Sequence, residues 1–196
     1  MLAFFTLLAY VIFMVGTPGP ANLILMLAGV RQGLRQCIGF ILGLLVGKIV
    51  LNLFIGFGFG LVLAEAPVWQ MLLSYVSAGY MIWLALKSWP ASDADTGNAE
   101  PSRGHLGFRA GLFVHPINPK AWVMCVLAWG QFAPALGDFS VQLPVVILTF
   151  AVCQLCLHSL WCWLGMIMGK SLRNNVRLAR AMILATVAIV LIAVLL

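Results

Sequence analysis

The chain is interrupted at Thr17-Pro18-Gly19-Pro20-Ala21-Asn22, inside an apolar run that extends from Leu2 to about Val30. A proline within a helix lacks an N–H donor and its ring clashes with the preceding turn, which costs about 3 kcal/mol, so an α-helix does not continue through two of them. In a bilayer core the freed backbone groups still need partners, so such a break faces protein or a water-filled cavity. The stretch therefore predicts a membrane helix that ends and restarts beside an internal site.

A second break lies in a second long apolar run, from about Leu106 to Ala135, and reads His115-Pro116-Ile117-Asn118-Pro119-Lys120. Two proline-interrupted membrane segments at corresponding places in two halves of a chain are typical of a transporter, whose substrate site lies where the breaks meet. We therefore expect the two breaks to lie together and to form one binding site.

The composition is that of a membrane protein. Of the 196 residues, 63% are hydrophobic and only 8% are charged, which excludes a water-soluble domain and predicts an all-α integral membrane protein. Because about 20 residues cross one bilayer, residues 1–196 have room for about six spans and form a single transmembrane domain. The first run is too long and too interrupted for a cleaved signal peptide. The expected spans are about 2–30, 39–63, 68–88, 106–135, 143–168 and 181–196.

The charged residues predict the orientation. The net charge of +6 does not indicate nucleic-acid binding, because the charges lie in short segments beside apolar spans. Most of the 11 Lys and Arg residues follow the first, third and fifth spans, whereas the other side carries only Glu65 and Asp138. By the positive-inside rule the basic side is cytoplasmic and both termini are periplasmic. Residues 1–89 and 106–196 then form two inverted three-helix repeats, each with a broken first helix, joined by a cytoplasmic loop at 90–105.

The two breaks have the chemistry of an anion site. A restarting helix exposes unpaired N–H groups with partial positive charge, which attract carboxylates, and Gly19 allows a ligand to approach the backbone closely. The alternative is a structural kink with a satisfied lysine. The predicted substrate-binding residues are Thr17, Pro18, Gly19, Pro20, Asn22, Lys48, Asn118, Pro119 and Lys120.

Two of these residues are lysines within spans. A charge at the middle of a bilayer costs ~2.5–3.5 kcal/mol and usually faces a cavity or a partner, yet no predicted span contains Asp or Glu. Either Lys48 and Lys120 hold a substrate carboxylate, or one of them carries an exchanged proton, because burial disfavours the charged amine. For Lys48, snorkelling to the interface is a further alternative.

A polar stripe in the fifth span adds candidates for cavity lining or proton relay. Gln154, His158 and Cys162 recur at four-residue steps and so share one helical face. His158 can relay protons or serve as a packing histidine, and Tyr80 of the third span either walls the cavity or packs against neighbours. Neither a metal nor a cofactor is expected, because Cys and His residues on a single helix cannot close a coordination shell.

Glycines recur at four-residue spacing in the second span, at Gly39, Gly43 and Gly47. Small residues at this spacing allow two helix backbones to approach closely. The pattern fits packing within the chain or, alternatively, a contact between two copies in a homodimer.

The sequence resembles the LysE/RhtB-type amino-acid exporters of bacterial inner membranes over essentially its whole length. The most specific pieces are the stretch 17–22, Asn118-Pro119-Lys120-Ala121, and Gly79-Tyr80-Met81-Ile82-Trp83-Leu84-Ala85-Leu86-Lys87. The resemblance implies efflux of amino acids or close derivatives, driven by the proton gradient, and no enzymatic activity.

The same resemblance favours a substrate class. Exporters of basic amino acids in this family tend to carry acidic groups in the second and fourth spans, where this chain has Lys48 and Met124. A neutral, small or thiol-containing amino acid is therefore favoured, such as homoserine, threonine, cysteine or O-acetylserine. The alternatives are a membrane thiol-redox protein, which needs a reactive Cys at each break, and a metal-ion transporter, which needs a His, Cys or carboxylate cluster.

Overall fold

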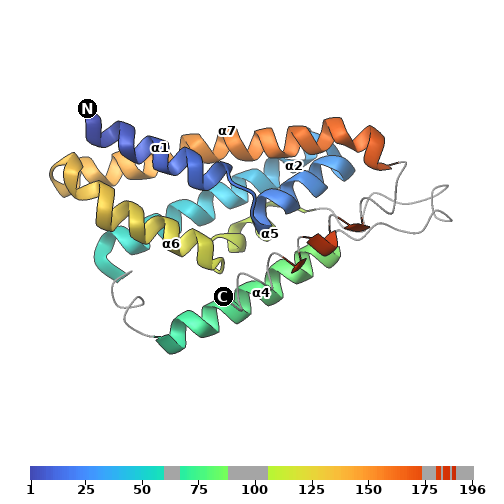
Figure 1. The fold of residues 1–196 in the computed structure, drawn as a ribbon, viewed down its shortest axis with the longest axis horizontal. Helices are drawn as coiled ribbons and strands as arrows, with labels where there is room; N and C mark the ends of the chain where they lie inside the picture. The colour runs from blue at the N-terminus through green and yellow to red at the C-terminus, as the bar shows by residue number, and fades with distance from the viewer. Residues whose placement is uncertain (60–66, 88–105, 174–179, 182, 186, 189–196) are drawn as a thin grey trace.

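The computed structural model describes residues 1–59, 67–87, 106–173, 180, 181, 183–185, 187 and 188. Every regular element within these residues is helical (Figure 1). The predicted loop at 90–105 and most of the predicted last span lie outside them. The elements are α1 (Leu2–Gly16), α2 (Pro20–Phe54), the π-helix η1 (Ile55–Phe59), α4 (Pro67–Lys87), α5 (Phe108–Val114), α6 (Pro119–Leu127), the π-helix η3 (Ala128–Phe132), the 3₁₀-helix η4 (Ala133–Leu136) and α7 (Phe139–Arg173).

Both proline-containing stretches separate helices. After α1 the backbone is extended at Thr17 (φ −64°, ψ 144°) and at Gly19 (φ −168°, ψ 172°), and α2 begins at Pro20. The second stretch follows the same plan, because Asn118 is extended and α6 begins at Pro119. A proline at the first position of a helix is favourable, since its φ suits the helix and the N–H it lacks would have no partner there. The prolines therefore determine where each helix restarts.

A sharp turn at Gly33 divides α2 into two antiparallel segments. Gly33 has φ 70° and ψ 167°, which a residue with a side chain rarely adopts, and Figure 1 shows the chain reversing there. The sequence predicted a longer connection, with the second span beginning near Gly39. The structure corrects this boundary, because a single glycine makes the turn and helical geometry resumes at Leu34.

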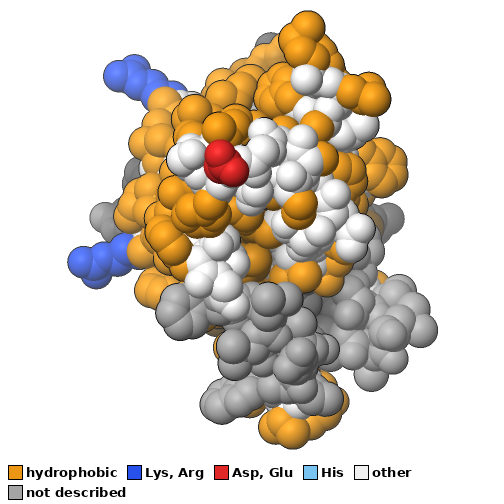
Figure 2. Space-filling model, turned by 90° about the vertical axis from the view of Figure 1, so that its left-hand side faces the viewer, with side chains coloured by type: hydrophobic (Ala, Val, Ile, Leu, Met, Phe, Trp, Pro, Cys, Tyr) orange, Lys and Arg blue, Asp and Glu red, His pale blue; other side chains and the backbone are white. Residues whose placement is uncertain are grey.

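The helix α7 has two distinct faces. One face is buried and includes Val146, Phe150, Gln154, His158 and Cys162, whereas the opposite face exposes large apolar side chains. Figure 2, which views the molecule from the left-hand side of Figure 1, shows that apolar side chains cover much of the described surface there. Among the described residues, two segments are long and apolar enough to cross a membrane: Pro20–Gly58, which includes the turn at Gly33, and Phe139–Met168. The exposed side chains of α7 include Val141, Leu148, Val152, Leu155, Trp163 and Ile167.

Glycines bring the helices into backbone contact inside the chain. A Cβ on Gly43 would collide with the carbonyl oxygen of Phe108 in α5, and one on Gly111 of α5 would collide with the carbonyl oxygen of Phe40 in α2. Gly47 likewise lies against α5, at the carbonyl of Leu112. The glycine row of the second span is therefore an internal packing surface, as the first of the two sequence-based interpretations expected.

A similar close crossing joins the first part of α2 to α7. A Cβ on Gly29 would meet the carbonyl of Cys162, and one on Gly165 would meet the carbonyl of Met26. One crossing holds α5 against the segment of α2 that follows Gly33, and the other holds α7 against the segment of α2 that precedes Gly33. As a result, the break after α1 and the break after α5 lie next to each other in the middle of the molecule.

Candidate functional site

The two breaks are joined directly by Lys120. Its Nζ donates to Thr17 Oγ1 at 2.9 Å and lies 3.4 Å from the carbonyl oxygen of Thr17. Thr17 belongs to the first break and Lys120 to the first turn of α6, so this contact connects segments 103 residues apart. The two breaks therefore lie in contact with each other, and their role as one binding site stays a prediction.

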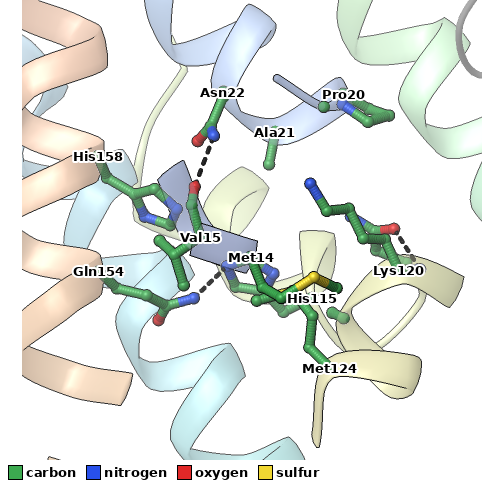
Figure 3. Close-up of a pocket in the computed structure, with 13 residues that line it drawn as sticks. Met14, Val15, Pro20, Ala21, Asn22, His115, Lys120, Met124, Gln154 and His158 are labelled. Atoms are coloured by element: carbon green, nitrogen blue, oxygen red, sulfur yellow. Dashed lines mark hydrogen bonds between the residues drawn. The ribbon is translucent and has the colours of Figure 1, made fainter. Parts of the chain in front are cut away.

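A small cavity lies at this junction (Figure 3). Its volume is about 30 Å³, which accommodates roughly one or two water molecules. In this conformation the cavity is therefore too small for an amino acid, and a larger ligand requires the surrounding side chains or helices to move apart. The lining residues are Met14, Val15, Gly19, Pro20, Ala21, Asn22, His115, Asn118, Lys120, Ala121, Met124, Gln154 and His158.

Side chains satisfy the carbonyl groups that the first break leaves free. Asn22 Nδ2 donates to the carbonyl oxygens of Val15 at 2.8 Å and Thr17 at 2.9 Å. Trp161 Nε1, from α7, donates to the carbonyl oxygen of Gly16 at 3.2 Å. Because unpaired backbone groups are costly in an apolar interior, these bonds allow the helix to stop at mid-molecule, and Asn22 has a structural role as well as a place in the cavity.

The second break is satisfied in the same manner. Asn118 Oδ1 accepts from the backbone N–H of Lys120 at 3.0 Å and so caps α6. Trp122 Nε1 donates to the carbonyl oxygen of Pro116 at 2.7 Å. Hydrogen bonds thus satisfy carbonyl groups at both breaks, and at the second break they also satisfy the first N–H groups of α6.

Lys48 lies near the cavity but is not part of its lining. Its side chain is 1% exposed, its Nζ donates to the carbonyl oxygen of Ala121 at 3.2 Å, and the amine lies 4.7 Å from the centre of the Phe150 ring. Lys48 is among the substrate contacts that the sequence predicts. In the structure it joins the second half of α2 to the α6 backbone, and its contact with a substrate stays a prediction.

Lys120 is the cation that reaches the cavity. A Cβ added to Gly19 would lie 3.2 Å from its Nζ, so the absence of a side chain at Gly19 makes room for the amine. None of the residues that line the cavity is Asp or Glu. The positive charge is therefore balanced only by neutral oxygen atoms of Thr17 in this state.

Histidine 115 belongs to the site although it was not among the predicted site residues. Its side chain is 5% exposed, and its Nε2 lies 2.9 Å from Gln154 Nε2. Because two donors do not bond to each other, either the imidazole nitrogen accepts from the amide or the amide is turned so that its oxygen accepts from the imidazole. Its ring stacks on that of His158 with centroids 5.7 Å apart and an interplanar angle of 17°. The only sequence signal was its position immediately before Pro116, since its partners are far away in the chain.

The remaining predicted residues have other surroundings. Pro18 is exposed, and the side chain of Pro119 lies outside the described residues. Tyr80 is not part of the cavity lining, and its hydroxyl donates to the carbonyl oxygen of Ala110 in α5 at 2.7 Å. Tyr80 therefore supports the segment that leads into the second break.

Replacing Asn22 with leucine is expected to destabilise the protein strongly. The change removes two hydrogen bonds: it leaves the carbonyl group of Val15 unpaired, at about 1–3 kcal/mol, and leaves the half-buried carbonyl group of Thr17 only its 3.4 Å contact with Lys120 Nζ. Thermal unfolding in detergent measures the effect. The matched control is Thr6→Val, which removes an exposed hydroxyl from α1 and should leave the midpoint unchanged. A wild-type midpoint for Asn22→Leu would contradict the structural role.

Comparison with known proteins identifies the family. The family described as LysE type translocator matches residues 12–196. This chain belongs to the LysE type translocator family. Membership agrees with the apolar helices and the exposed apolar face of α7, and the proteins of this family are described as translocators.

Several relatives within this translocator family have named substrates. The homoserine/homoserine lactone efflux protein of Salmonella typhimurium is 29% identical over 119 residues, covering 59% of this chain and 57% of that protein. The cysteine/O-acetylserine efflux protein of Salmonella choleraesuis is 33% identical over 117 residues (59% and 58%). The leucine efflux protein of an Enterobacter strain is 29% identical over 136 residues (67% and 64%). These matches thus span less than two thirds of each relative, and no solved structure matches the translocator.

Proposed function

We propose that this translocator exports small neutral amino acids across the bacterial inner membrane in exchange for protons. The observation that carries the proposal is Lys120, a cation at the junction of two helix N-termini in a cavity whose lining contains no acidic residue. The named relatives are efflux proteins for homoserine, cysteine, O-acetylserine or leucine, which supports an amino acid as the substrate.

The carboxylate of the amino acid binds at Lys120. The first turns of α2 and α6 both line the cavity, and the positive end of each helix dipole favours a negative charge there. A carboxylate makes a stronger, charge-assisted bond with an ammonium group than a hydroxyl does. The substrate therefore replaces Thr17 Oγ1 as the partner of Lys120 and neutralises the buried charge.

A neutral side chain suits the rest of the site. Lys120 is part of the cavity lining, and the ammonium group of Lys48 lies against the carbonyl oxygen of Ala121, another lining residue. A second positive charge on the substrate would meet these cations without any lining carboxylate to compensate, and like charges in a poorly solvated site cost several kcal/mol. Lysine and arginine are therefore poor substrates.

Transport follows from movement of the two halves about the breaks. In our proposal residues 1–89 and 106–196 are inverted repeats that rock against each other, with both termini in the periplasm and the basic loops in the cytoplasm. The bond between Thr17 and Lys120 joins the halves in the closed state. A lysine or His158 carries the exchanged proton.

Counterflow in proteoliposomes tests the proposal. The purified translocator is reconstituted into proteoliposomes that contain unlabelled homoserine, cysteine, leucine, lysine or arginine. Uptake of labelled homoserine is then followed with and without an imposed pH gradient. The neutral amino acids should drive exchange at least about tenfold faster than lysine or arginine, and the gradient should accelerate net transport. Preferential exchange of lysine would overturn the substrate class, and indifference to the gradient would overturn the coupling to protons.

Replacing Asn118 with aspartate should separate the stability of α6 from its function. Aspartate retains the oxygen that caps the helix, so the unfolding midpoint should stay close to that of the wild type. Its negative charge, however, shares the cavity with Lys120 and should weaken the binding of neutral amino acids at least about tenfold by repelling their carboxylate.

The Asn118→Ala variant is the matched comparison for this change. It removes the cap without adding charge, so it should lower the unfolding free energy by about 1 kcal/mol and weaken binding less than aspartate does. Half-maximal substrate concentrations and thermal midpoints are measured for both variants. Wild-type affinity in Asn118→Asp would contradict carboxylate binding in this cavity.

A further inference from the structure

We propose that His115, Gln154 and His158 form a side-chain subsite that selects amino acids with a hydroxyl or thiol group over apolar amino acids of the same shape. The inference rests on the proposed function, because it concerns the same cavity. The names of the relatives do not settle this choice, since they include polar substrates and leucine.

The first observation is a set of buried polar atoms without partners. Within the described structure, Asn22 Oδ1, His115 Nδ1, Gln154 Oε1 and His158 Nδ1 have no hydrogen bond. These side chains are 4%, 5%, 1% and 2% exposed, and all four line the cavity. Because more than about 90% of buried polar groups in proteins are hydrogen-bonded, four unpaired atoms around a single cavity indicate groups reserved for an occupant.

The second observation is the distribution of chemistry around the cavity. Figure 3 shows Lys120 on one side and His158 with Gln154 on the opposite side, and Asn22 lies above the space between them. Apolar side chains, among them Val15 and Met124, occupy the wall between these polar groups. The cavity therefore has a cationic side, a neutral polar side and an apolar wall.

An amino acid presents its groups in a matching arrangement. The carboxylate pairs with Lys120, the α-ammonium donates to the unpaired Oδ1 of Asn22, and the methylene groups pack on the apolar wall. The end of the side chain then reaches His115, Gln154 and His158. The site contains no carboxylate for the α-ammonium, so Asn22 is the acceptor that the geometry provides.

A hydroxyl group fits the subsite because it can donate and accept. A neutral imidazole has one donor and one acceptor nitrogen, and the amide oxygen of Gln154 is an acceptor. An apolar side chain of equal size would leave these buried atoms unpaired. A site built to bind a hydroxyl rejects the analogue without it far more strongly than an apolar pocket discriminates by size.

The test compares two amino acids of nearly equal shape, homoserine and norvaline, as competitors in the counterflow assay. The wild-type translocator should bind homoserine at least about tenfold more tightly than norvaline. Threonine and valine provide a second pair, for which the same direction is expected.

Three variants assign the preference to the subsite. Gln154→Met keeps the side-chain volume without polar atoms and should reduce the homoserine-to-norvaline ratio to within about threefold. His158→Gln retains a donor and an acceptor and should keep most of the preference. Thr149→Val is the matched control, because Thr149 is a buried polar residue of α7 that bonds to Val145 and does not line the cavity; its ratio should equal that of the wild type.

The outcomes separate this inference from the proposed function. Exchange of neutral amino acids with equal affinity for homoserine and norvaline would overturn the subsite and leave the exporter proposal standing. A loss of preference in Thr149→Val equal to that in Gln154→Met would also overturn it. If no amino acid is exchanged by the wild type, the proposed function itself fails. Should Gln154→Met not fold, the wild-type ratios for the two pairs still decide the question.

Discussion

Replacing Lys120 with alanine should reduce amino-acid export at least about 100-fold while leaving a folded, membrane-inserted protein. The ammonium group is the one full positive charge that reaches the cavity lining, and its contacts are neutral oxygen atoms of Thr17. Loss of one partner from a buried, hydrogen-bonded charge pair typically costs 2–5 kcal/mol of binding free energy, which supports an effect of about this size.

Counterflow at saturating homoserine measures this loss, and thermal unfolding in detergent reports on the fold. Lys120→Met is a useful second variant, because it keeps a long side chain beside Gly19 and removes only the charge; it should be as inactive as the alanine variant. Arg35→Ala is the matched control, since it removes an exposed cation from the turn region of α2 and should transport normally. Wild-type export by Lys120→Ala would remove Lys120 from the site.

Replacing Gly43 with valine should prevent the protein from folding. A Cβ at this position would collide with the backbone of Phe108, and backbone atoms cannot rotate away as a flexible side chain can. Since overpacking commonly costs 1–3 kcal/mol even where side chains can adjust, we expect a loss of at least about 3 kcal/mol here, because α5 and α2 would have to separate.

The yield of monodisperse protein after detergent extraction measures this effect. The matched control is Gly79→Val, the same substitution on α4, where a Cβ would meet nothing within 4 Å. This control should be produced at wild-type levels. If Gly43→Val were as stable as Gly79→Val, the close crossing of α2 and α5 would be wrong, and so would the placement of the second break beside the first.

These two predictions concern the cation in the cavity and the helix packing that positions it. The glycine crossings place α5 and α6 against α2, and Lys120 uses that placement to reach Thr17 across the junction. The tryptophan, asparagine and lysine side chains that pair the freed carbonyl groups then allow both breaks to exist inside an apolar molecule. Binding chemistry and stability are therefore coupled at the same few residues.

Much of the fold was accessible from the sequence because it depends on local physics. A proline at the start of a helix and a stretch of apolar residues act without regard to distant parts of the chain, so the positions where α2 and α6 restart could be predicted from Pro20 and Pro119. The family was also recognisable from the residues around these breaks. The turn at Gly33 was harder, because a single glycine inside a helical pattern does not by itself indicate a reversal.

The roles of individual side chains were decided only by the tertiary structure. Lys48 and Lys120 are equally conspicuous in the sequence, yet the rotation of each helix turns Lys48 toward the carbonyl of Ala121 and Lys120 toward the cavity. His115 acquires its place through Gln154 and His158, which lie about 40 residues further along the chain. Sequence alone determined an all-helical membrane protein, because composition is a local property, and its motifs resembled those of the translocator family to which it belongs. Which polar groups face the cavity depends on how the helices pack, and that packing is set by backbone contacts between glycines and residues distant in the chain.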